Sequence, residues 1–164
     1  MDNIKETIAR AEINLQRKLE WTSRYDTRII FVAGIAIAML GILANASGIM
    51  ANWTCFAYIS FGLTLLLLLL CLGCVYLAQS PKVLAPNQSL LFFGTISKLD
   101  YSDFSDKFKN TTNEKYLEDL LHQIHINSVI LCGKFAYLKY AIFFIGLSAI
   151  PWGISIYLSK LYLT

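Results

Sequence analysis

Two stretches without charge dominate the pattern of hydrophobic and polar positions along this chain. Positions 29–81 hold no Asp, Glu, Lys, Arg or His, and positions 140–159 form a second such stretch. As one helix the first stretch would be about 80 Å long, whereas the hydrocarbon core of a bilayer is about 30 Å thick. It must therefore turn back, and the residues suited to the turn are Asn45, Ser47, Gly48 and Asn52. The pattern predicts three transmembrane helices, near 29–46, 55–78 and 140–159.

The distribution of basic residues predicts which side of the membrane each part faces. All 14 Lys and Arg residues except Lys160 lie before position 29 or between positions 82 and 139. Because basic residues accumulate on the cytoplasmic side, we expect the N-terminus and the middle segment in the cytoplasm, and the turn and C-terminus outside. The predicted fold is an all-α membrane protein. Its parts are a cytoplasmic amphipathic helix over 1–28, a two-span hairpin over 29–78, a cytoplasmic helical region over 79–136, and a third transmembrane helix with a short outer tail over 137–164.

Apolar residues at helical spacing predict that the helices continue outside the membrane. Near the N-terminus they recur every three or four positions, at Ile4, Ile8, Ala11, Leu15 and Leu19. We expect this amphipathic helix to run into the first span and to pack on the other cytoplasmic helices rather than lie flat on lipid.

The middle segment predicts two further helices. Asp100 can cap a short helix over 101–109, and Thr111 or Thr112 can cap a longer one. The longer helix has an apolar stripe with a heptad repeat, formed by Leu117, Leu121, Ile124, Ser128, Leu131 and Phe135. Because the stripe leads directly into the second charge-free stretch, which is the third predicted span, we expect one long helix that crosses the membrane interface.

A stripe of small residues runs along the first span, formed by Gly34, Ala38, Gly41, Asn45 and Gly48. Small residues on one face let helix backbones approach closely, which is the usual basis of helix association in lipid. The stripe therefore predicts a packing interface, either with another span of the same chain or with a neighbouring subunit.

The sequence contains no arrangement of residues typical of an enzyme. His122 and His125 lie three positions apart with Glu118 one turn before His122, but a zinc site needs a third or fourth matched ligand. We expect no catalytic residue, no metal and no cofactor. The formal net charge of +3 does not indicate nucleic-acid binding, since the acidic residues lie in the same segments as the basic ones.

Four short motifs carry a family resemblance. They are Tyr25-Asp26-Thr27-Arg28, Asn87-Gln88-Ser89-Leu90-Leu91-Phe92-Phe93-Gly94-Thr95-Ile96, Asp119-Leu120-Leu121-His122-Gln123-Ile124, and Lys134-Phe135-Ala136-Tyr137-Leu138-Lys139-Tyr140-Ala141. In this order and at this length the chain resembles the PycTM family, the small transmembrane effectors of bacterial Pycsar anti-phage systems. One departure is that the family often has Ala-Asp-x-Lys at the first motif.

The resemblance implies a protein of the bacterial inner membrane that rests until a cyclase makes cyclic CMP or cyclic UMP, and then damages the bilayer and aborts infection. We also expect homo-oligomers, because three spans cannot enclose a water path within one subunit and the Gly34 to Gly48 stripe offers a close-packing face. A cyclic mononucleotide has one phosphate charge and one flat base, so it favours a cation and an aromatic face. The candidate ligand-binding residues are Arg28, Phe92, Phe93, Lys98, Tyr101, Lys134 and Lys139.

Two other functions stay open at this point. The chain could anchor a partner protein through its cytoplasmic helices, or it could be a small channel or transporter subunit. The last reading is disfavoured because the predicted spans carry no acidic, basic or His side chain, which transport pathways usually need.

Overall fold

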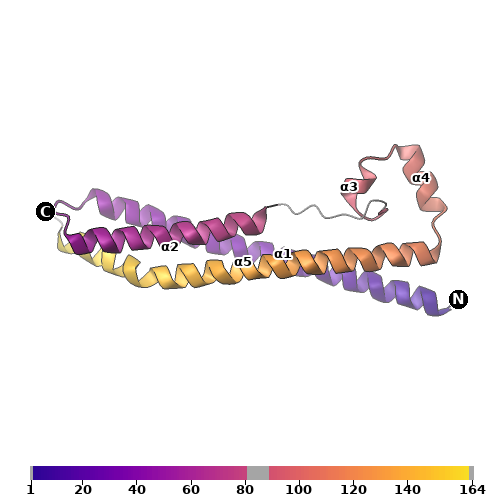
Figure 1. Ribbon diagram of the computed structural model, residues 1–164, viewed down its shortest axis with the longest axis horizontal. Coiled ribbons are helices and arrows are strands. Elements are labelled where there is room, and N and C mark those ends of the chain that lie inside the picture. The colour runs from indigo at the N-terminus through magenta and orange to yellow at the C-terminus, as the bar shows by residue number, and fades with distance from the viewer. Residues whose placement is uncertain (1, 81–88, 163–164) are drawn as a thin grey trace. The chain divides into compact units, whose positions relative to one another are not determined.

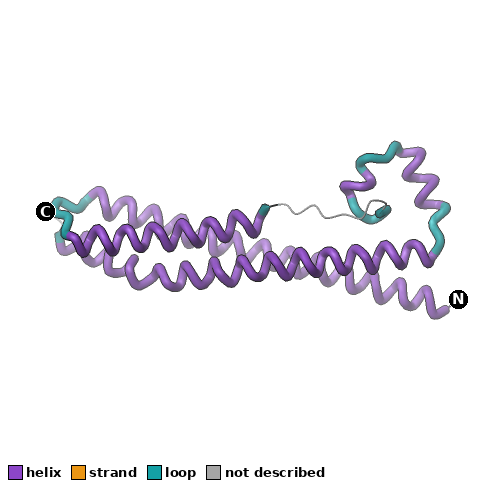
Figure 2. The backbone as a smooth tube through the Cα atoms, in the orientation of Figure 1, coloured by secondary structure: helices purple, strands orange, loops and turns teal. Residues whose placement is uncertain are grey.

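The computed structural model describes residues 2–80 and 89–162, and in this part of the chain all regular structure is helical (Figures 1 and 2). The elements are α1 (Asp2–Gly48), α2 (Cys55–Gln79), α3 (Phe93–Ile96), α4 (Tyr101–Lys109) and α5 (Asn113–Leu161). The predicted all-α class is therefore confirmed. The two predicted continuations are also confirmed, since α1 and α5 are each a single unbroken helix.

Three helices, α1, α2 and α5, are long and apolar enough to cross a membrane, as the charge-free stretches predict. Packing within the chain covers only a small part of them. In the most apolar window, 28% of α1, 33% of α2 and 28% of α5 are buried. Large apolar side chains such as Phe31 and Ile150 are about 70% exposed. A surface of this kind is costly in water and suited to lipid, so the fold is that of a membrane protein.

The connection between α1 and α2 lies slightly later in the chain than the sequence predicts. Asn52 lies in this connection, whereas Asn45, Ser47 and Gly48 belong to the last turns of α1. Thr54 forms the N-cap of α2, because its hydroxyl oxygen accepts a 3.2 Å hydrogen bond from the backbone N–H of Ala57. The first span therefore continues two residues past its predicted end at 46.

The chain divides into two compact units. Unit 1 comprises Met1–Arg24 and Pro81–Gly133, and unit 2 comprises Tyr25–Ser80 and Lys134–Thr164. Both α1 and α5 contribute residues to each unit. The N-terminal amphipathic helix belongs to the same unit as α3, α4 and the start of α5, as expected if it packs on the other helices outside the spans.

In unit 2, the ends of the three long helices enclose an apolar cluster. Its buried members are Leu43, Ala46, Met50, Ala57, Phe61 and Leu158. Trp53 stacks on Tyr58 at 4.9 Å between ring centroids, and Trp152 Nε1 donates a 3.1 Å hydrogen bond to the backbone oxygen of Met39. These contacts bring α1, α2 and α5 together at this end of the unit.

Buried hydroxyl groups also join α2 to α5. Ser60 Oγ lies 2.9 Å from both the backbone oxygen of Pro151 and Ser155 Oγ. Ser155 Oγ lies 2.8 Å from the same backbone oxygen, and both serines are buried. Hydrogen bonds between helices are favourable in surroundings that offer no water as an alternative partner.

In unit 1, the predicted short helix has the bounds that the sequence indicates. Asp100 occupies the N-cap position of α4, although its side chain makes no capping hydrogen bond. Thr112 rather than Thr111 caps α5, since its hydroxyl oxygen accepts from the backbone N–H of Lys115 at 3.4 Å. The buried face of α5 differs from the predicted stripe, because Leu120 is 1% exposed and Leu121 is 52% exposed.

Candidate functional site

A cluster of polar and aromatic side chains joins α1 to α5 at the first residues of unit 2. Lys134 Nζ lies 3.3 Å from Asp26 Oδ1 and 5.3 Å from the centroid of the Tyr25 ring. Tyr25 is fully buried and makes an edge-to-face contact with Phe135 at 5.4 Å. The Tyr25 hydroxyl has no hydrogen-bond partner among the described residues. Of the predicted ligand-binding residues, Lys134 is therefore the one that the structure places in a defined polar cluster of unit 2.

The other predicted ligand-binding residues lie apart. Arg28 and Lys139 are exposed residues of unit 2. In unit 1, the rings of Phe92 and Phe93 lie 4.6 Å apart, Lys98 is exposed, and Tyr101 is 85% exposed at the start of α4. The seven candidates thus divide between the two units.

The predicted packing stripe is exposed along its whole length. Gly34, Ala38, Gly41, Asn45 and Gly48 are all exposed on α1. A Cβ atom added to any of the three glycines would meet no atom within 4 Å. The described part of the chain therefore does not use this stripe to pack its own spans, and packing against a neighbouring subunit is the alternative that stays open.

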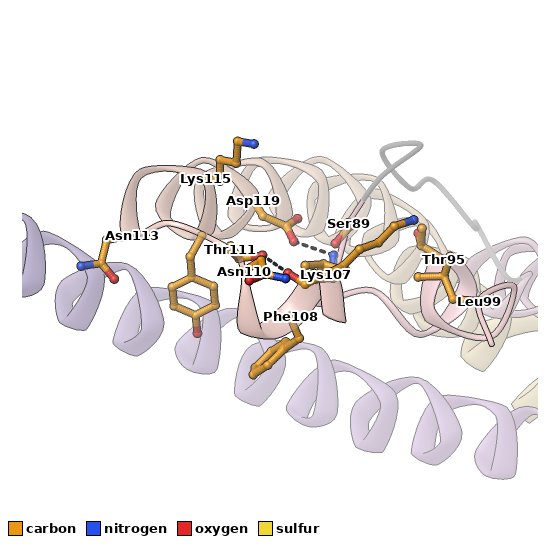
Figure 3. Close-up of a pocket in the computed structure, with 12 residues that line it drawn as sticks. Ser89, Thr95, Leu99, Lys107, Phe108, Asn110, Thr111, Asn113, Lys115 and Asp119 are labelled. Atoms are coloured by element: carbon orange, nitrogen blue, oxygen red, sulfur yellow. Dashed lines mark hydrogen bonds between the residues drawn. The ribbon is translucent and has the colours of Figure 1, made fainter. Parts of the chain in front are cut away.

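A cavity of about 850 Å³ lies in unit 1 (Figure 3). This volume is within the range of about 300–1,000 Å³ that is usual for small-molecule sites. Residues of α4, of the connection to α5 and of the first turns of α5 form part of its wall, and residues 89, 90, 95 and 99 form the remainder. Many of the lining side chains are polar, among them Thr95, Lys107, Asn110, Thr111, Lys115 and Asp119.

Hydrogen bonds to α5 fix one wall of this cavity. Asp119 Oδ2 accepts a 2.8 Å bond from the backbone N–H of Leu90, and Gln123 Nε2 donates to Ser89 Oγ at 3.0 Å. Ser89 Oγ also accepts from the backbone N–H groups of Leu91 and Phe92, each at 3.1 Å. Ser89 and Gln123 are buried, so the backbone around residue 90 is held against α5 by bonds that exclude water.

The charges of the cavity come from two lysines and one aspartate. In Figure 3 the Lys107 side chain extends toward Thr95 and Leu99, whereas Lys115 points away from Asp119. Among residues 2–80 and 89–162, neither lysine ammonium has an ion-pair partner. The two positive charges and one negative charge give the lining a formal charge of +1.

Tyr116 connects this wall to α1. Its hydroxyl donates a 2.9 Å hydrogen bond to Glu12 Oε1. Burial raises the pKa of the Tyr116 phenol, and the hydrogen bond and charge of Glu12 raise it further. The phenol is therefore protonated at physiological pH and remains a donor to Glu12.

The sequence analysis did not name the cavity residues as ligand-binding candidates. Ser89, Leu90, Thr95 and Asp119 lie in motifs of the family resemblance, but the remaining lining residues belong to no apolar stripe and no motif. A signal was present in the segment from Lys107 to Asn113, which gathers cations, amides and hydroxyls around one aromatic ring, Phe108. His122 and His125, which were considered as metal ligands, are both exposed. In the described residues no group of three or more His, Cys, Asp or Glu side chains is placed to hold a metal ion.

The fold defines the class of this protein: an all-α membrane protein with three membrane-capable helices and a small helical unit that carries a polar cavity. A family model described as the Pycsar effector protein domain, PycTM, matches residues 10–159. The chain belongs to this family, and it is a membrane effector of anti-phage defence. No curated protein and no solved structure matches the chain.

Proposed function

We propose that this chain damages the membrane when it binds a cyclic pyrimidine mononucleotide, cyclic CMP or cyclic UMP, and thereby aborts phage infection. The observation that carries the proposal is the family match over residues 10–159. The damage would be a pore or a general disruption of the bilayer, and the action is non-enzymatic.

Continuity of the helices supports control by a ligand. Both α1 and α5 run from unit 1 into unit 2 without a break in the helix. A ligand that changes the arrangement of unit 1 would therefore act on backbone that continues into the membrane helices. The ligand can shift the equilibrium only by its difference in affinity for the two states, so a small toxicity is expected without it.

We further propose that the active form is a homo-oligomer in the bacterial inner membrane, with the N-terminus in the cytoplasm. Three helices are too few to enclose a water path within one subunit. The exposed stripe from Gly34 to Gly48 supports a close contact with a second copy. The distribution of Lys and Arg supports the orientation.

Expression in bacteria with a pyrimidine nucleotide cyclase tests the proposal. Overproduction of the chain alone should be mildly toxic, and co-expression of active cyclase should cause severe loss of membrane potential, measured with a voltage-sensitive dye. A catalytically inactive cyclase is the matched control. Equal toxicity with the active and inactive cyclases, at normal protein levels, would refute the nucleotide switch and favour a membrane anchor for a partner protein.

A further inference from the structure

We propose that the cavity of unit 1 is the binding site for the cyclic mononucleotide, with Lys107 contacting the phosphodiester and Asp119 contacting the base. This assignment rests on the proposed function. Every residue that lines the cavity belongs to unit 1, including those from the first turns of α5.

The cations of the cavity are available to an anion. Lys107 and Lys115 line the cavity, and no carboxylate of the described residues pairs with either ammonium. Lys134, by contrast, is already 3.3 Å from Asp26 Oδ1. An anion would displace water from Lys107 but would have to displace a carboxylate from Lys134. Of the two cavity lysines, Lys107 rather than Lys115 is the better contact for an anion, since the Lys107 side chain extends along the cavity toward Thr95 (Figure 3).

The single carboxylate of the cavity, Asp119, selects between ligands of different charge. Asp119 uses Oδ2 to accept from the backbone N–H of Leu90, which leaves Oδ1 able to accept from an N–H of a pyrimidine base. It also repels a second negative charge near the lysines. A cyclic phosphodiester carries one negative charge, whereas the linear monophosphate carries nearly two at neutral pH. The Asp119 carboxylate therefore disfavours the linear form more than the cyclic form.

The remaining polar groups fit a sugar and a base. Thr95, Asn110 and Thr111 line the same cavity and bring hydroxyl and amide groups. The Thr111 hydroxyl donates to the backbone oxygen of Lys107 at 2.6 Å, so toward a ligand its oxygen can accept. The cavity volume of about 850 Å³ leaves room for a ligand of this size together with some water.

Binding measurements on the full chain in detergent test the site. We would measure the affinity for cyclic CMP and cyclic UMP by isothermal titration calorimetry. The proteins compared are the wild type, Lys107→Gln, Lys107→Arg and Lys109→Gln. Loss of a charged hydrogen bond should weaken binding about tenfold or more in Lys107→Gln, while Lys107→Arg keeps most of the affinity. Lys109→Gln is the matched control, because Lys109 lies in the same turn of α4 and does not line the cavity. Circular dichroism and the elution volume verify the fold of each variant.

A second comparison tests the selection by charge. Asp119→Asn keeps an oxygen that can accept from Leu90 and removes the negative charge. It should raise the affinity for linear CMP relative to cyclic CMP several-fold. An unchanged ratio would overturn the role of Asp119.

The outcomes separate this assignment from the proposed function. If the wild type binds a cyclic nucleotide and Lys107→Gln binds it equally well, the cavity assignment fails and the nucleotide switch stands. If the wild type binds neither cyclic nucleotide, the switch fails and the assignment fails with it. If inorganic phosphate competes as strongly as the cyclic nucleotide, the cavity is a simple anion site and the assignment is again overturned.

Discussion

Lys134 Nζ lies 3.3 Å from Asp26 Oδ1, and this ion pair joins α5 to α1 across 108 positions of sequence. The Lys134 side chain is 20% exposed and the Asp26 side chain is 39% exposed. Water therefore screens the pair in part. The pair should contribute only modestly more to the free energy of unfolding than a fully exposed pair does. The pair sits next to the buried ring of Tyr25, which holds the two helices in contact.

Removing either charge should weaken this junction. We expect Lys134→Gln and Asp26→Asn each to lower the free energy of unfolding by about 1 kcal/mol, which corresponds to a fall in Tm of roughly 2–4 °C for a chain of this size. Each single variant already loses the whole ion pair. The double variant should therefore lose clearly less unfolding free energy than the sum of the two single losses. Thermal unfolding followed by circular dichroism in detergent measures this, with the exposed Lys139→Gln as control. Fully additive losses would contradict an energetic coupling between the two side chains.

The buried hydroxyl contact between α2 and α5 predicts a smaller effect. Ser60→Ala removes the hydrogen bond to the backbone oxygen of Pro151, and bonds of this kind in membrane helices average about 0.6 kcal/mol. Ser47→Ala is a matched control, because within residues 2–80 and 89–162 Ser47 Oγ donates a hydrogen bond to the Ala44 carbonyl of its own helix and to no other helix. Unfolding in mixed micelles should show a loss for Ser60→Ala alone. Equal stability of both variants would indicate that the contact between the helices does not depend on this bond.

The exposed small-residue stripe predicts that a large side chain placed on it blocks association between copies of the chain without unfolding them. Gly41→Leu should leave the monomer folded, because a Cβ atom there meets nothing within 4 Å, but it should block close contact with a second copy. Gly73→Leu is the control, since Gly73 is also exposed, on α2, and a Cβ atom there also meets nothing within 4 Å. Crosslinking in membranes and the toxicity assay should both distinguish the two variants. If Gly41→Leu remains as toxic and as readily crosslinked as Gly73→Leu, the stripe is no interface.

The native cysteines offer a test of orientation. Cys55 and Cys132 are both exposed, and the distribution of basic residues predicts that they lie on opposite sides of the membrane. In spheroplasts, an impermeant thiol reagent should label Cys55 and spare Cys132 until the membrane is permeabilised. Single-cysteine variants assign the label to one residue. Labelling of Cys132 in intact spheroplasts would reverse the proposed topology.

The sequence predicts the membrane helices well because the signal is an absence of charge over many residues. No single residue decides it, and the predicted 55–78 span differs from α2 by one residue at its end. The starts of two helices are also predictable from the sequence, since Asp100 and Thr112 lie one residue before α4 and α5, although only Thr112 makes a capping hydrogen bond. These features depend on neighbours along the chain.

Contacts between distant segments are harder to predict. The heptad assigned Leu121 to the buried stripe, but Leu120 is the buried residue, because the face of α5 is decided by what packs on it. The bonds from Leu90 to Asp119 and from Gln123 to Ser89 span 29 and 34 positions, and they build the wall of the cavity. Such long-range pairs leave no periodic signal in the sequence, so a cavity built from them cannot be predicted from hydrophobic periodicity.

The Tyr25 hydroxyl is buried without a hydrogen-bond partner among the described residues, so one polar group at the junction of α1 and α5 is unsatisfied. An unsatisfied buried hydroxyl costs about 1–3 kcal/mol, and each 1.4 kcal/mol changes a population tenfold. Any rearrangement that lets this oxygen reach water recovers that energy. The unsatisfied hydroxyl therefore lowers the free energy that a ligand must supply to rearrange the junction. We expect Tyr25→Phe, which keeps the ring and removes the hydroxyl, to give a more stable protein with a higher dose threshold for killing.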